Sequence, residues 1–193
     1  MIFSELDHRM SVVLRWSVVE TIRKQNLSTH SYNVAIMADR IARRLSSDLK
    51  IAHAAVLYAL YHDKIESVTG DFPSYMKPHV DERAAVAVVE QLRDEEEGND
   101  GSAGDDPLVR FIVKSADYID ACIFLRMEIS LGNRSVSYHL RHLEARFRRY
   151  VEESQGEVTA DAHLVYDWYQ QDVVDGLFGG NGQYVSEIDG FPK

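Results

Sequence analysis

Cysteine is almost absent from this chain, since Cys122 is the only one among 193 residues. A single cysteine excludes an intrachain disulfide and a zinc site of CxxC pairs, and it is typical of a reducing compartment. Long apolar runs are missing too, because no stretch approaches the roughly 18 apolar residues of a membrane span. The N-terminus, MIFSELDHRMSVVLRW, lacks the basic start and apolar core of a signal peptide. We therefore expect a cytoplasmic protein that does not span a membrane.

Positive charge is also scarce. The chain has 21 Lys and Arg against 31 Asp and Glu, a formal net charge of −10. This balance argues against polymeric nucleic acid or an anionic membrane as a partner, because both need a broad basic surface. A small anionic substrate remains possible, because a bound metal or a few focused cations can reverse the local potential.

What the chain does have is helical periodicity, with apolar residues three and four positions apart and no alternating strand pattern. The fold class expected is all-α, a single-domain helical bundle over residues 1–178 with a loop-rich C-terminal tail at 179–193. Helices are predicted over residues 31–45, 51–67, 80–97, 107–131, 134–154 and 160–177. Ser28 or Thr29 is expected to cap the first of these, and the helix at 51–67, apolar nearly all round, is expected to be buried.

The stretch LYALYHDKIESVTGDFPSYMK ends an apolar run in His62 and Asp63 and then supplies Glu66. Burying an imidazole and a carboxylate side by side is costly unless something pairs with them. A divalent cation would offset that cost, because His nitrogen and Asp oxygen are ligands for Zn, Mn, Fe or Co. His30 and Asp117 would complete a four-ligand set drawn from three helices.

Each of these residues also has a purely structural interpretation. A His-Asp pair on a helix is often only solvated or hydrogen-bonded. His30 could simply lie near a helix start, and Asp117 could form a buried salt bridge. Asp120 is expected on the surface, and Cys122 is expected to be a core thiol.

Resemblance to a known family decides between these interpretations. The order His, His-Asp, Asp resembles the signature of HD-domain metal phosphohydrolases. The segments RW, RKQNLSTHSYNVA, YHDKIESVTGDFPSYMK and VKSADYIDACIFLRMEISLGN resemble those of YfbR-type 5′-deoxynucleotidases and related small phage-type deoxynucleoside triphosphate hydrolases. The similarity covers roughly residues 10–150. It implies an HD-type helical domain that needs a divalent metal, which could be Co, Mn, Zn, Fe or Mg.

The resemblance also implies roles for individual residues. The implied metal ligands are His30, His62, Asp63 and Asp117. Glu66 matches the acidic catalytic residue of the family. The implied substrate-binding residues are Arg15 and Trp16 against the nucleotide, Asp71 at the deoxyribose, and Lys77 and Lys114 at phosphate oxygens. Trp16 would form a bulky wall that excludes a ribose 2′-hydroxyl.

This chain departs from the family pattern in two places. Thr29 precedes the first histidine where the family commonly has Glu, and Lys64 follows His-Asp where small or apolar residues are usual. The substrate pocket is therefore expected to be retuned.

The resemblance leaves three activities open. The main expectation is hydrolysis of a deoxynucleoside 5′-monophosphate to deoxynucleoside and phosphate. The first alternative is a triphosphohydrolase that releases triphosphate from a deoxynucleoside triphosphate such as dATP. The second is a nucleotide-sensing HD module without catalysis. Because small members of this family form homo-oligomers, at least a dimer is expected.

Overall fold

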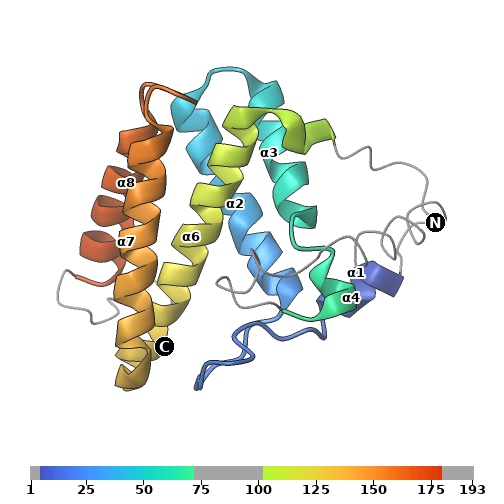
Figure 1. Ribbon diagram of the computed structural model, residues 1–193, viewed down its shortest axis with the longest axis vertical. Coiled ribbons are helices and arrows are strands. Elements are labelled where there is room, and N and C mark those ends of the chain that lie inside the picture. Colours follow the sequence, from blue (N-terminus) through green and yellow to red (C-terminus); the bar gives the residue numbers. More distant parts are fainter. Residues whose placement is uncertain (1–4, 72–101, 180–193) are drawn as a thin grey trace, which may run out of the picture. The chain divides into compact units, whose positions relative to one another are not determined.

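The computed structural model describes residues 5–71 and 102–179, and the regular elements in these ranges are helices, with a loop between Met10 and Leu27 (Figure 1). The described residues contain no strand, only two isolated β-bridges, which confirms the all-α prediction. None of the helices within these ranges has the length and apolar content needed to cross a membrane. The helix expected at 80–97 and Lys77 lie outside the described residues, as does all of the expected tail except Gly179.

The chain divides into two compact units, Met1–Ala116 and Asp117–Lys193, so the expectation of one domain over residues 1–178 stays a prediction. The first unit holds α1 (Glu5–Met10), α2 (Leu27–Leu45), α3 (Leu49–Tyr61), α4 (Glu66–Thr69), η2 (Ser102–Asp105) and the start of α6 (Pro107–Ser130). The second holds the rest of α6, η3 (Arg134–Val136), α7 (Ser137–Ser154), α8 (Ala162–Trp168) and the π-helical η4 (Tyr169–Leu177).

Helix α2 begins earlier than the sequence suggested. Its N-cap is Asn26, whose side-chain oxygen accepts a hydrogen bond from the backbone N–H of Thr29 at 2.9 Å. Asparagine is among the preferred N-cap residues, and the earlier start lets Leu27, which is fully buried, join the core. The prediction of Ser28 or Thr29 as the cap was therefore wrong.

Helix α3 packs against α2 through one face only. The buried residues on that face are Ala52, Ala55 and Ala59, and small side chains of this kind allow two helices to approach closely. Leu57 and Tyr61 are 42% and 38% exposed on the other side. The prediction of a buried helix is therefore met on one face of α3 and not on the other, because an apolar composition does not by itself bury every face.

In the second unit, Arg126 of α6 joins α7 to η4. Its Nε donates a hydrogen bond to the Tyr169 hydroxyl at 3.1 Å, and its Nη2 pairs with Oε1 of Glu144. The Tyr169 hydroxyl donates to the same carboxylate oxygen at 2.5 Å. Burial, with Cys122 and Glu144 nearby, raises the pKa of Tyr169, so the hydroxyl keeps its proton and remains a donor. Cys122 is fully buried as predicted, and burial raises the pKa of its thiol as well.

Glu144→Ala should lower the free energy of unfolding by about 2–4 kcal/mol, because it leaves the Arg126 charge without its carboxylate in a mostly buried position. The side chains of Arg126 and Glu144 are only 15% and 20% exposed. Urea unfolding would measure the change. Glu152→Ala is the matched control, since Glu152 pairs with Arg148 in the same helix while 59% exposed, and it should cost less than about 0.5 kcal/mol. Equal losses in the two variants would contradict this account.

Candidate metal and nucleotide site

The His-Asp pair lies in a tight turn between two helices. Helix α3 ends at Tyr61, and the chain continues with helical backbone angles through His62 and Ile65 into α4. The bonds in the turn run from the N–H of Lys64 to Tyr61 O and from the N–H of Glu66 to Asp63 O, both at 2.9 Å. The predicted helix over 51–67 is therefore interrupted at the motif.

Three charged side chains of this turn are buried. Asp63, Lys64 and Glu66 are 6%, 7% and 2% exposed. Helix α4 then ends at Gly70, whose φ of 81° lies in the left-handed region that glycine adopts without strain. The next residue is Asp71, so the turn, α4 and Gly70 together set the direction from which Asp71 reaches the site.

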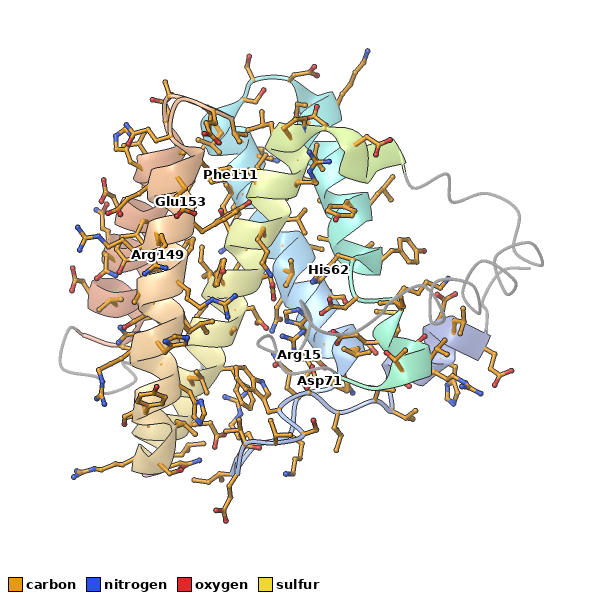
Figure 2. All side chains as sticks on the ribbon, viewed as in Figure 1. Arg15, His62, Asp71, Phe111, Arg149 and Glu153 are labelled. Carbon is orange, nitrogen blue, oxygen red and sulfur yellow. The ribbon has the colours of Figure 1, made fainter. Side chains whose placement is uncertain are left out.

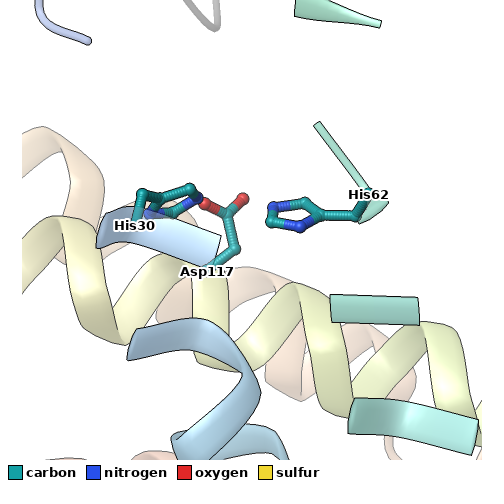
Figure 3. A group of neighbouring side chains, drawn as sticks. All are labelled: His30, His62 and Asp117. Carbon is teal, nitrogen blue, oxygen red and sulfur yellow. The ribbon is translucent and has the colours of Figure 1, made fainter. Parts of the chain in front are cut away.

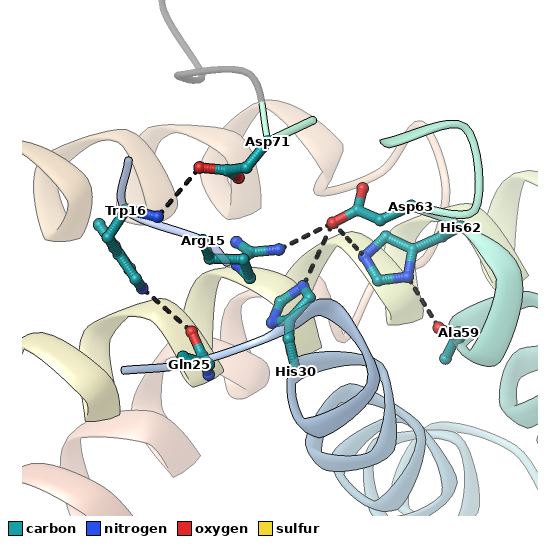
Figure 4. Close-up of polar contacts among 8 residues, drawn as sticks. All are labelled: Arg15, Trp16, Gln25, His30, Ala59, His62, Asp63 and Asp71. Atoms are coloured by element: carbon teal, nitrogen blue, oxygen red, sulfur yellow. Dashed lines mark hydrogen bonds and ion pairs between the residues drawn. The ribbon is translucent and has the colours of Figure 1, made fainter. Parts of the chain in front are cut away.

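Two imidazoles face the Asp63 carboxylate (Figure 4). Nε2 of His30 and Nε2 of His62 each lie 3.5 Å from Asp63 Oδ2, and His30 is fully buried. Nδ1 of His62 lies 2.7 Å from the carbonyl oxygen of Ala59. A carbonyl only accepts hydrogen bonds, so Nδ1 carries the hydrogen, and the neutral ring then has its lone pair on Nε2. This tautomer is the one that a metal ligand requires at Nε2.

Asp117 completes a group of metal-ligand atoms (Figure 3). One ligand atom each from His30, His62 and Asp117 lies within 4.8 Å of the others. Asp117 follows Ala116 directly in the continuous helix α6, so it is one residue beyond the helical turns that belong to the first unit. Two imidazole nitrogens and a carboxylate oxygen are a donor set that fits a divalent transition metal or zinc.

Arg15 compensates the buried charge of Asp63. Its Nη1 lies 2.8 Å from Asp63 Oδ2, and the two side chains are 12% and 8% exposed. Asp63 is therefore beside both histidines, while one of its oxygens is also paired with a guanidinium. The family resemblance implied that Arg15 contacts the nucleotide, and it gave no sign of this ion pair.

The neighbouring Trp16 has an unusual backbone. Its φ is 65°, the only positive value among the described residues other than glycine, and a bulky side chain there costs about 1–2 kcal/mol. Asp71 Oδ2 accepts a hydrogen bond from the Trp16 N–H at 2.9 Å, and the indole Nε1 donates to Gln25 Oε1 at 3.0 Å. Figure 2 shows Arg15 and Asp71 close together near the start of α2. The backbone contact of Asp71 adds to the sugar contact predicted for it.

One of the two lysines predicted to bind phosphate oxygens lies within the described residues. Lys114 is exposed on α6, one turn before Asp117, and Lys77 lies outside the described residues.

The Lys64 ammonium lies 3.4 Å from Asp7 Oδ1 and 5.3 Å from the centre of the Tyr61 ring. Lys64 therefore fastens α1 to the turn.

Asp120 is 3% exposed, so the surface position expected for it was wrong. Its place three residues after Asp117 was a signal that it shares the inner side of α6.

Known proteins resemble this chain in sequence and in fold. The family described as 5′-deoxynucleotidase YfbR-like matches residues 2–160. A 5′-deoxynucleotidase of Vibrio cholerae is 31% identical over 164 residues, covering 75% of this chain and 84% of that protein. A 5′-deoxynucleotidase of Photorhabdus laumondii is 29% identical over 154 residues, covering 70% of this chain and 78% of that protein.

Among solved structures, the cyanophage S-2L HD phosphohydrolase bound to dA and one catalytic Zn²⁺ ion superimposes with a TM-score of 0.65. It is 22% identical and covers 87% of this chain and 94% of that one, a likeness that shows the fold. The family match spans most of the chain and includes the positions of His30, His62 and Asp117. The resemblance predicted from the sequence is thus confirmed, and the chain belongs to the YfbR-like 5′-deoxynucleotidase family.

Proposed function

We propose that this protein is a metal-dependent hydrolase that converts deoxynucleoside 5′-monophosphates to deoxynucleosides and phosphate. The observation that carries the proposal is the group formed by His30, His62 and Asp117, with Asp63 beside both imidazoles. It occurs in a member of a family whose relatives are named 5′-deoxynucleotidases. A bound divalent ion would supply charge neutralisation at the phosphate and a water whose pKa is lowered toward about 7.

The chain's own residues would hold the phosphate and move the proton. Glu66, 2% exposed at the start of α4, is the carboxylate that we assign to accept a proton from the attacking water. Arg15, 12% exposed beside Asp63, would neutralise charge that builds up on phosphate oxygens. Lys77 and Lys114 remain the predicted cations for the outer phosphate oxygens.

Sugar selection would fall to the pair Trp16 and Asp71. The indole would occupy the space that a 2′-hydroxyl needs. Asp71 uses Oδ2 to hold the Trp16 backbone, and its second oxygen would accept a hydrogen bond from a 3′-hydroxyl. One carboxylate can serve both contacts because each oxygen accepts separately.

The assembly and location are also proposals. We expect at least a dimer, in keeping with the apolar side chains exposed between α1 and α2: Val12, Val18 and Ile22 are 61%, 62% and 58% exposed. A reducing cytoplasm suits the single buried cysteine. The substrate is a small deoxynucleotide in every activity considered.

Product analysis tests the reaction directly. The purified protein is incubated with dAMP, AMP, dATP or ATP, each with Co, Mn, Zn, Mg or a chelator, and the products are resolved by chromatography. We expect deoxyadenosine and phosphate from dAMP, little reaction with AMP, and none with chelator. Release of triphosphate from dATP would instead make the protein a triphosphohydrolase. Absence of turnover with metal bound would mean a nucleotide-sensing module.

A further inference from the structure

We propose that Gln25 is a positioning residue that sets sugar specificity, by holding the indole of Trp16 in the orientation that rejects ribose. The inference rests on the proposed function for the identity of the ligand. The proposed effect on the sugar is exerted through the side chain of Trp16.

Gln25 is buried where its neighbours are not. Its exposed fraction is 5%, whereas Arg23 and Lys24 immediately before it are exposed. A buried amide is retained where it makes hydrogen bonds, because desolvation is otherwise uncompensated. The carbonyl oxygen of this amide accepts a bond from Trp16 Nε1 at 3.0 Å, so the amide is directed at the indole (Figure 4).

The backbone of Gln25 also binds the residue next to Trp16. Its carbonyl oxygen accepts a bond from the N–H of Arg15 at 2.8 Å, and the N–H of Leu27 donates to Val13 O at 3.1 Å. These two backbone hydrogen bonds close the loop between Arg15 and Gln25. Gln25 fixes Arg15 through its main chain and Trp16 through its side chain, so one residue sets the position of both.

Trp16 is thus held at both ends. Asp71 binds its backbone N–H and keeps φ at 65°, while Gln25 binds the far end of the side chain. With the backbone and Nε1 both fixed, the ring cannot rotate about its side-chain bonds without losing a hydrogen bond. The indole is therefore pre-organised before any ligand arrives.

Pre-organisation is what a steric wall needs in order to discriminate. A pocket that can relax rejects an added hydroxyl only weakly, because the wall moves aside. A wall whose position is fixed by supporting hydrogen bonds cannot move aside, so the added hydroxyl clashes with it and binding is weakened. Loss of the Gln25 contact should therefore weaken rejection of ribose while leaving deoxyribose accepted.

The test measures the indole and the sugar preference separately. The chain has two tryptophans, so in a Trp168→Phe background the fluorescence of Trp16 is observed alone. Gln25→Met keeps the side-chain length and removes the acceptor, whereas Gln25→Glu keeps an acceptor oxygen. We expect acrylamide quenching and fast anisotropy decay of Trp16 to increase by about twofold in the Met variant and to stay unchanged in the Glu variant.

Sugar preference is read with nucleosides, which carry no phosphate to hydrolyse. Calorimetric titration should show deoxyadenosine binding more tightly than adenosine, with the ratio of the two dissociation constants falling about 5–10-fold in Gln25→Met and restored in Gln25→Glu. Trp16→Phe removes the same hydrogen bond from the other side. Adding Gln25→Met to that variant should therefore produce no further fall.

Several results would overturn the inference. The wild type could bind the two nucleosides equally tightly, or bind neither of them. The Gln25→Met variant could leave the ratio of dissociation constants or the mobility of Trp16 unchanged. Circular dichroism melting shows whether each variant is folded, and Trp16→Phe tests the same bond if Gln25→Met is not. A wild type that prefers deoxyadenosine yet hydrolyses no dAMP would refute the proposed reaction, while the result for Gln25 would stand.

Discussion

Asp63→Ala should lower kcat/KM for dAMP by at least about 10⁴-fold and abolish bound metal in the same protein. The carboxylate lies 3.5 Å from Nε2 of both His30 and His62 and 2.8 Å from the Arg15 guanidinium. Removing it takes away a negative charge and leaves the Arg15 cation beside the two imidazoles, where it opposes the entry of a divalent ion. Elemental analysis after dialysis gives the metal content, and a phosphate-release assay gives turnover.

Asp39→Ala is the matched control for this variant. Asp39 also pairs with an arginine, since the Arg43 Nε lies 2.9 Å from its Oδ2, but on the exposed side of α2. Metal content and turnover should remain at the wild-type level. If Asp63→Ala retained stoichiometric metal, the carboxylate would have no part in the site. Asp63→Asn then distinguishes charge from shape, because it keeps the size of the side chain.

Glu66→Gln should keep the metal and lose about 10²–10⁴ in kcat, because an amide cannot take the proton that a carboxylate takes. Glu66 is 2% exposed and lies at the first position of α4, directly after the turn that carries His62 and Asp63. The substitution preserves volume, so the fold and KM should change little. Steady-state kinetics and metal analysis of the same preparation separate the two effects.

Two outcomes would contradict the role of Glu66. Near-normal turnover would show that another group handles the proton. Loss of the metal together with the activity would make Glu66 a supporting partner of the ligands. Glu5→Gln is a suitable control, because Glu5 forms an exposed ion pair with Arg9 on α1 and should leave both measurements unchanged.

The helices were predictable because burial repeats with the helical period. The range 107–131 predicted α6 to within a residue, since Pro107 marks its start and apolar side chains follow at helical spacing. The segments 134–154 and 160–177 were helical as predicted, although the second continues from α8 into the π-helical η4. Side-chain periodicity does not distinguish these helix types over two turns.

The grouping of three candidate ligands was predictable, but the ion pairs around them were not. His30, His62 and Asp117 come together as their spacing and family resemblance suggested. The ion pair between Arg15 and Asp63 spans 48 positions, and no local pattern indicates a contact at that separation. Lys64 shows the same limit, since only the structure reveals that its ammonium pairs with Asp7.

Gln25 was overlooked for a related reason. A glutamine within RKQN is typical of a polar loop, and its burial depends on the path of residues 11–26. The bridge between Leu14 and Asn26 brings the two ends of that segment together. Only then does the amide become an interior group.

The left-handed backbone of Trp16 and its indole hydrogen bond act in opposite directions on stability. Glycine or asparagine adopts such a φ far more readily than tryptophan, but either would remove the indole donor from the buried Gln25 carbonyl oxygen. Loss of a buried hydrogen bond costs about as much as the relief of strain gains. Selection for heat resistance alone would therefore gain little by replacing tryptophan at position 16.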